Sequence, residues 1–323
     1  MSRRSLPGLL LASCLVWFVG SCASRRPSID VPVSSWPGYE YFYLAHELGF
    51  DRVEGIEIFP RQYPDPQSIV HAYLRAELPI AQLTTIELVE LCARVPERCP
   101  VVILVLDESV EADQIISVPS LLSIRDLKGK SIAVSRSNFG PFVLGRALQL
   151  HGLSLSEIKM RKMELGLMPK ALFTGSVDAA VLPSPSSSVT LRGSPLRPLF
   201  NSAVIPGEIL TVLVVEKNFL KLNQNRVVSL LRSWSAAHAE ARLSPQRALP
   251  LLAERERLSV DEFRAAEQGL RYFSLSDQVE MLQPEGRVAR NIEAVRDLQE
   301  KLQLIPPGSI IPKVTSTYVE AAQ

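Results

Sequence analysis

The sequence predicts an α/β protein of two lobes, and three observations lead to this prediction. Short apolar segments alternate with longer amphipathic segments, as strands and helices do in α/β domains. The chain has 323 residues, about twice the length of a typical domain. A second run of alternating strands and helices begins near residue 131, after the first run has ended.

In the first run the elements follow one another closely. We predict strands at the ranges 29–34, 55–59, 80–83 and 101–106, and helices at 39–48, 67–77 and 85–94. The strand 101–106 is almost purely aliphatic. That composition is typical of a central strand in a parallel sheet that is buried on both faces.

The second run repeats the pattern. We predict strands at 131–135, 157–163 and 177–182, and helices at 141–151 and 169–174. Pro141 suits a first helical position, with Gly140 as the preceding N-cap. The apolar strand 210–215 could cross back to the first sheet. The rest of the chain is predicted to be mainly helical, over 225–243, 244–256, 259–270 and 288–302.

The first 21 residues have the pattern of an export signal. Arg3 and Arg4 precede an apolar run over 6–20, which is too short for a comfortable transmembrane helix. The run ends in Val-Gly-Ser before Cys22, which resembles the lipobox of bacterial lipoproteins, where the cysteine is lipidated and becomes the mature N-terminus. We predict a lipidated linker over 22–28. Two alternatives stay open: lipidation at Cys14, whose surroundings fit the same pattern, and an uncleaved anchor helix.

Charge and histidine placement argue against several classes of site. The formal net charge is +1, and it becomes about −1 once Arg3 and Arg4 leave with the signal. A nearly neutral chain has no electrostatic footprint for nucleic acid. The four histidines are scattered along the sequence, so we expect no metal site.

The two cysteines that follow the signal, Cys92 and Cys99, flank the end of a predicted helix. One even pair in an oxidising compartment suggests a short-loop disulfide. Two free thiols at a helix end are the alternative.

Four motifs carry a resemblance to a known family. They are Trp-Pro-Gly-Tyr-Glu at 36–40, Asp-Leu-Lys-Gly-Lys at 126–130, Gly-Ser-Val-Asp-Ala-Ala at 175–180 and Ile-Pro-Gly-Glu-Ile at 205–209. Their order and spacing over residues 33–275 resemble the nitrate/sulfonate/taurine and thiamine-precursor (SsuA/THI5-like) group of periplasmic solute-binding proteins.

The resemblance implies the type II periplasmic-binding-protein fold, with two α/β lobes and a ligand cleft between them. Lobe 1 would comprise residues 29–109 and 212–323, and lobe 2 residues 110–211. The crossovers between them would lie near 107–113 and 208–211. Ligands in such folds bind at the carboxyl ends of strands, against helix N-termini. Hinge closure on the ligand is the expected motion.

The resemblance also implies a function. We expect the substrate-binding lipoprotein of an ABC importer, which captures a small organic solute and delivers it to a permease with its ATPase. It would be a lipid-anchored monomer on the periplasmic side of the envelope, without cofactor. The alternative is an orphan envelope lipoprotein of the same fold that senses a ligand or binds a partner. We expect no enzyme, because the sequence has no triad, metal spacing or phosphate loop.

The loop 36–40 is the first predicted part of the ligand site. Trp36 and Tyr39 could sandwich a flat ring or a cation. Gly38 would let the backbone approach closely. Glu40 could pair with a ligand amine or favour the first turn of the helix. For Trp36 the alternative is a side chain that plugs the core of lobe 1.

The remaining predicted site residues lie at the other strand ends. The hydroxyls of Thr84 and Thr85 suit a polar ligand group, although ordinary N-capping is an alternative. The loop 135–140 is the best anion-accepting place in the sequence, at a helix N-terminus. Arg136 there is either a ligand anchor or a solvated side chain. The other candidates are Asp113, Ser135, Ser137, Asn138, Phe139, Ser184 and Glu208.

The sequence also departs from the family pattern. Acidic residues are common in the family where Ile86, Ser184 and Thr211 stand here. If those acids hold a cationic or hydroxylated ligand in relatives, this protein binds a different ligand or binds weakly.

Overall fold

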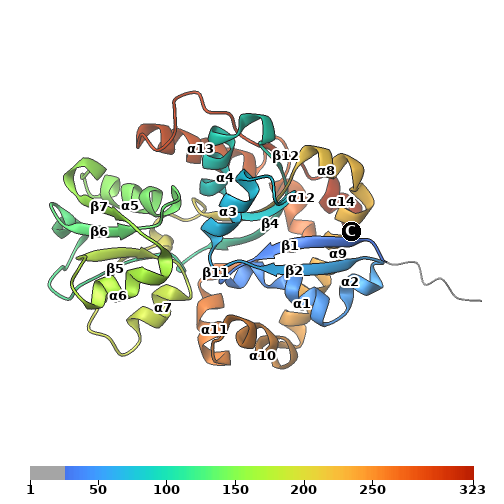
Figure 1. The fold of residues 1–323 in the computed structure, drawn as a ribbon, viewed down its shortest axis with the longest axis horizontal. Helices are drawn as coiled ribbons and strands as arrows, with labels where there is room; N and C mark the ends of the chain where they lie inside the picture. The colour runs from blue at the N-terminus through green and yellow to red at the C-terminus, as the bar shows by residue number, and fades with distance from the viewer. Residues whose placement is uncertain (1–25) are drawn as a thin grey trace, which may run out of the picture.

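A computed structural model describes residues 26–323, so the predicted export signal and Cys22 lie outside the described residues. Two five-stranded sheets separate the chain into two lobes, which lie side by side in Figure 1. In lobe 1 the strand order is β11-β4-β10-β3, and β12 pairs with the start of β4. The bounds are β3 (Ile80–Thr84), β4 (Val101–Ser109), β10 (Leu210–Val215), β11 (Leu270–Arg271) and β12 (Lys313–Val314).

A parallel pair of strands, β1 (Ser28–Val33) and β2 (Glu57–Gln62), extends lobe 1 beside β3. Gln82 Nε2 ties this pair to the larger sheet by donating to the Pro32 carbonyl at 2.6 Å. Helices cover both sheets: α1 (Tyr41–Glu47), α2 (Phe50–Val53), α3 (Pro66–Leu74), α4 (Thr85–Arg94), α8 (Lys217–Leu222), α9 (Gln224–Leu243), α10 (Pro245–Glu256), α11 (Val260–Gln268), α12 (Leu275–Met281), α13 (Arg287–Lys301) and α14 (Thr317–Ala322).

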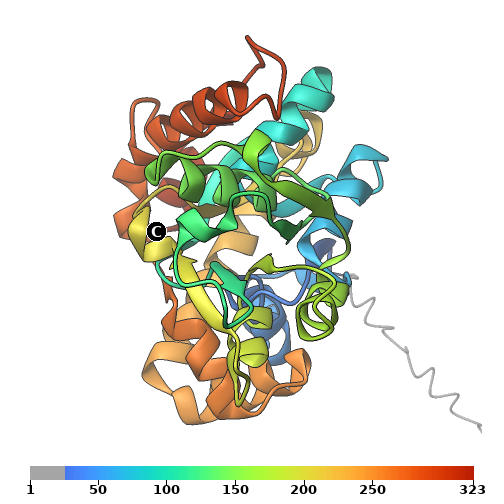
Figure 2. The same cartoon turned by 90° about the vertical axis from the view of Figure 1, so that its left-hand side faces the viewer.

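Lobe 2 is a sheet in the order β7-β6-β8-β5-β9, with helices packed around it (Figure 2). The pairs β6–β7 and β6–β8 are parallel, whereas β5 runs antiparallel to β8 and β9. The bounds are β5 (Gln114–Ser117), β6 (Ser131–Val134), β7 (Lys159–Lys162), β8 (Ala179–Leu182), β9 (Arg197–Asn201), α5 (Phe139–Leu150), α6 (Met168–Phe173) and α7 (Ser186–Leu191).

The structure corrects two local predictions. Strand β4 is not the parallel centre of a sheet, because it pairs antiparallel with β10 and β11. All nine of its residues are buried, and burial on both faces selects aliphatic residues in either kind of sheet. Helix α5 begins at Phe139 with Asn138 in the N-cap position, so Gly140 is not the N-cap. A Cβ on Gly140 would lie 2.8 Å from the Ser135 backbone nitrogen, so close packing requires glycine there.

Two connecting segments join the lobes and touch each other. The outward segment runs from Ser109 to Gln114, and the return segment from Asn201 to Leu210. Ser109 N donates to the Ile209 carbonyl at 3.1 Å, the hydroxyls of Ser109 and Ser202 lie 2.8 Å apart, and Ser202 N donates to the Asp113 carbonyl at 2.9 Å. The two crossovers are therefore hydrogen-bonded to each other, and the lobe bounds predicted from the sequence stay a prediction.

A disulfide joins Cys92, in the last turn of α4, to Cys99. It closes the turn between α4 and β4 at the end of the helix remote from lobe 2. Within residues 26–323, no helix is long and apolar enough to cross a membrane.

Candidate functional site

The candidate site consists of two small adjoining cavities between the lobes, each of about 40 Å³. They share Pro66 and Glu87 of lobe 1 with Phe139 and Pro183 of lobe 2. The first cavity is also lined by Trp36, Tyr39, Thr84 and Asp113, and the second by Asp65, Gln67, Ser135, Ser137, Leu165 and Val181. The structure therefore brings seven predicted residues to one cleft: Trp36, Tyr39, Thr84, Asp113, Ser135, Ser137 and Phe139.

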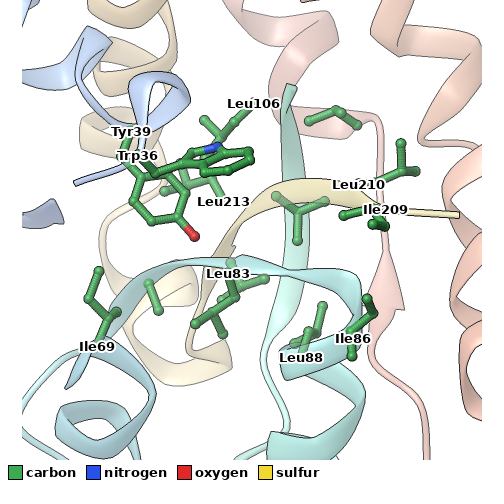
Figure 3. Close-up of a cluster of buried hydrophobic side chains, with 14 of the residues drawn as sticks. Trp36, Tyr39, Ile69, Leu83, Ile86, Leu88, Leu106, Ile209, Leu210 and Leu213 are labelled. Atoms are coloured by element: carbon green, nitrogen blue, oxygen red, sulfur yellow. The ribbon is translucent and has the colours of Figure 1, made fainter. Parts of the chain in front are cut away.

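Trp36 stands at the start of a 3-10 turn (Pro37–Tyr39) that follows β1. Its side chain is 6% exposed and belongs to the lobe 1 core, yet it also lines the first cavity. Figure 3 shows the rings of Trp36 and Tyr39 together above Leu83. The indole Nε1 donates to Asp107 Oδ2 at 3.0 Å. Trp36 is therefore both a part of the lobe 1 core and a wall of the first cavity.

Position 38 requires glycine because the Asp107 carboxylate packs where a Cβ would lie. A Cβ at this position would lie 1.9 Å from Asp107 Oδ2 and 3.1 Å from the Trp36 Nε1 atom. The close approach that the sequence predicted is therefore made by Asp107.

We expect Gly38→Ala to lower the free energy of unfolding by about 1–3 kcal/mol, because the new methyl group overpacks this site and displaces Asp107 from the indole. Urea unfolding measures the loss. Gly166→Ala is the matched control, because nothing lies within 4 Å of a Cβ there and the backbone is not left-handed. Equal stabilities for the two variants would contradict this explanation of Gly38.

Three buried carboxyl groups lie close to Trp36 and Tyr39. Glu87 is 3% exposed, and Asp107 and Asp113 are fully buried. Burial raises the pKa of each to about 7. Burial also raises the pKa of Tyr39 well above its usual value, and the negative charges of these three acids add to that rise. Tyr39 therefore lies within the field of all three.

The three carboxyl groups differ in their partners. Glu87 accepts from Thr84 N at 3.2 Å, Thr84 Oγ1 at 3.0 Å and Ser137 Oγ at 3.3 Å. Neither oxygen of Asp113 has a hydrogen-bond donor within the described chain, and Asp107 Oδ1 has none either. The Ser109 hydroxyl lies near enough to favour the ionised form of Asp113 and so opposes part of the rise in its pKa. Its own hydrogen bond is with the Ser202 hydroxyl, at 2.8 Å.

Glu87 was missed at the sequence level. An acid was expected at position 86, where Ile86 is instead buried in the core. The signal for Glu87 was present, because Thr84 followed three residues later by glutamate is a capping box, and the structure contains both of its hydrogen bonds. The first turn of α4 thereby holds a carboxylate at the cleft.

The loop of lobe 2 corrects the expectation of an anion site at the start of α5. Asn138 N donates to Glu90 Oε2 of α4 at 2.8 Å, and Gly140 N donates to Ser135 Oγ at 3.0 Å. The Asn138 amide donates to Gln299 Oε1 at 2.9 Å and to the Leu304 carbonyl at 3.1 Å. Protein groups thus occupy three of the donors in the loop that we predicted for a ligand: the Asn138 backbone N–H, the Asn138 amide and the Gly140 N–H.

Two predicted acids lie away from the two cavities. Glu40 is 1% exposed, lies 2.5 Å from Arg255 Nε, and has a pKa raised by burial and by neighbouring Glu256. Glu208 makes a bidentate pair with Arg146 at 2.9 Å and lines a separate cavity of about 490 Å³ between α5 and α13. Sequence proximity to a strand end did not reveal which side of the sheet these carboxylates would face.

Three other candidates lie beside the cavities without lining them. Ser184 is buried next to the lining residue Pro183. Thr85 is fully buried, and its hydroxyl has no partner within residues 26–323. Arg136 is half exposed and pairs with Glu164 at 2.8 Å, which favours the solvated reading.

Comparison with known families gives one match. Residues 36–248, more than half of the chain, match the family described as NMT1/THI5 like. The chain belongs to the NMT1/THI5-like family. This match confirms the family that the sequence motifs predicted. A comparison with curated protein sequences gives no match.

Solved structures confirm the fold of this NMT1/THI5-like chain. The periplasmic aliphatic sulphonate binding protein SsuA from Escherichia coli is 18% identical, with a TM-score of 0.70 over 90% of this chain and 91% of that one. SsuA from Xanthomonas axonopodis pv. citri, bound to MOPS, is 16% identical, with a TM-score of 0.73 over 90% and 98%. The desulfurization enzyme DSZB is 15% identical, with a TM-score of 0.64 over 92% and 99%. The two-lobed periplasmic-binding fold therefore hosts binding proteins and at least one enzyme.

Proposed function

We propose that this protein is the substrate-binding lipoprotein of an ABC importer, which captures a small organic solute between its lobes and delivers it to a membrane permease with its ATPase. The observation that carries the proposal is the interlobe cleft, where both lobes supply walls and the buried Asp113 carboxylate has no hydrogen-bond partner among residues 26–323. Family membership and the likeness to SsuA proteins support the same role.

The proposal includes the cellular setting. The chain would be anchored by lipid at Cys22 on the periplasmic side of the envelope, and it would act as a monomer without a cofactor. We propose binding without catalysis, which is supported by the likeness to the SsuA binding proteins.

A second candidate is an orphan envelope lipoprotein that senses a ligand or binds a partner protein. The occupied N-terminus of α5 favours it, because a donor site that is free for ligands in many receptors here holds Glu90. An adjacent permease gene and ATPase gene would favour the importer.

The test is a thermal-melting screen of the full chain in mild detergent over small sulfonates, pyrimidines, amines and aromatic acids. A ligand at 100 times its Kd adds about 2.7 kcal/mol to the free energy of unfolding. In a chain of this size that corresponds to a rise in Tm of about 4 °C. The absence of any shift, together with the absence of transporter genes nearby, would refute the importer proposal.

A further inference from the structure

The charges at the cleft indicate the charge of the ligand, an inference that rests on the proposed function. We propose that the cleft binds a small organic cation, with its ammonium or amidinium group beside Asp113 and Glu87 and its apolar part against Trp36, Tyr39 and Phe139.

The first argument is the state of Asp113. Its side chain is fully buried and lines the first cavity, and among the described residues the geometry gives neither carboxylate oxygen a hydrogen bond, since the nearby Ser109 hydroxyl lies 2.8 Å from the Ser202 hydroxyl. Buried charges in proteins are normally paired or hydrogen-bonded, because removing a carboxylate from water without compensation is costly. A ligand that carries N–H donors and a positive charge would satisfy both oxygens at once.

The second argument is the absence of a competing charge on the walls. Within the described part of the chain, no lysine, arginine or histidine lines either cavity, whereas Glu87 and Asp113 line the first, and Asp65 and Glu87 the second. A sulfonate or carboxylate ligand would meet these acids without a cationic partner. One backbone donor nearby, Asn138 N, already donates to Glu90 Oε2 at 2.8 Å.

The third argument is the chemistry of the remaining wall. Trp36, Tyr39 and Phe139 line the same cavity as Asp113. Aromatic faces attract cations within about 6 Å of the ring centre. The cavities have about 40 Å³ each, while a single water needs roughly 10–15 Å³ on the same scale, so a few non-hydrogen atoms fit in each. These dimensions suit a compact head group.

The test compares ligands that share an organic body and differ in the charge of the head group. The full chain in detergent is titrated at pH 7.5 with butylamine and benzylamine, and in parallel with butanesulfonate and benzenesulfonate. Binding is followed by melting temperature and by tryptophan fluorescence. We expect at least one amine to raise the Tm by several degrees at millimolar concentration and the matched sulfonate to leave it unchanged.

Variants then locate the amine. Asp113→Asn should weaken amine binding at least tenfold, and Glu87→Gln should weaken it as well. Asp261→Asn is the matched control, because its carboxylate lies on α11 and is 92% exposed. Circular dichroism and the melting curve without ligand establish that each variant is folded.

The outcomes separate this inference from the proposed function. Sulfonates that bind while amines do not would overturn the cation inference and leave a solute-binding protein. An amine whose affinity is unchanged in Asp113→Asn binds elsewhere, which also overturns it. If no compound in the wider screen binds, the cation inference fails, and the proposed function fails with it if transporter genes are also absent nearby.

Discussion

Replacing Trp36 with alanine is expected to lower the free energy of unfolding by roughly 3–5 kcal/mol and to abolish ligand binding. The indole is almost completely buried, so its removal leaves a cavity in the lobe 1 core. It also supplies the hydrogen bond to Asp107 Oδ2, and the second oxygen of that carboxylate has no donor in the described chain. A single change would thus remove one wall of the first cavity and the hydrogen bond to the buried Asp107 carboxylate. Urea unfolding and ligand titration measure the two losses.

A second pair of variants separates the hydrogen bond from the ring. Trp36→Phe keeps an aromatic wall and removes the donor to Asp107. Trp234→Phe removes an equally buried indole from α9, in a cluster with Tyr41 and His238 away from the two cavities. We expect weaker ligand binding only in Trp36→Phe. Equal affinities in both variants would show that Trp36 acts through the core alone.

Without added ligand, the protein is expected to lose about 2 kcal/mol of its free energy of unfolding as pH rises from 6.5 to 8.5. The pKa values of Glu87, Asp107 and Asp113 are about 7 in the folded protein, above the ordinary values of 4.5 and 3.8 for these side chains. In this window the folded state binds more protons than the unfolded state, so stability falls with rising pH. Glu256, whose pKa burial raises to about 7, acts in the same direction.

His238 limits the effect on the acid side. Burial lowers its pKa from 6.5 to about 4, so its contribution to stability is lost as pH falls below 6.5. One histidine offsets only one of the four carboxyl groups with a raised pKa, so stability should keep rising as pH falls from 8.5 to about 5. Urea unfolding between pH 5 and pH 9 measures the profile. Asp113→Asn should reduce the slope above pH 6.5 and be more stable than the wild type at pH 8.5 by roughly 1–3 kcal/mol. A flat wild-type profile would show that the three carboxyl groups are not the source.

The sequence was sufficient to predict the two lobes and the cleft between them. The motifs lie at turns and strand ends, where residue type is dictated by backbone geometry. The loop around Trp36, the threonine that begins α4 and the loop at Ser137 could all be placed at strand ends. Since strand ends converge in this fold, they also fell near one another.

Other features were beyond sequence reasoning for physical reasons. A purely aliphatic strand reports burial and carries no information on the direction of its neighbours, so the antiparallel pairing of β4 was missed. The donors at the start of α5 looked free because Glu90 lies 48 residues earlier in the chain. Glu208 was assigned to the cleft by its place next to β10, but its actual partner, Arg146, lies 62 residues away. Such long-range pairs are invisible to local patterns.

Helix α4 bears on how receptors of this lineage could change their solute over evolution. Glu87 lines the cavity, while Glu90, three residues later, accepts a hydrogen bond from Asn138 N in the loop of lobe 2. The Ser137 contact of Glu87 crosses the same gap. A substitution in this helix would alter solute preference and lobe docking together, which makes such mutations pleiotropic. Within residues 26–323, the Asp113 side chain has no hydrogen bond to the opposite wall, so it offers an evolutionary path to a new solute that leaves the docking of the lobes intact.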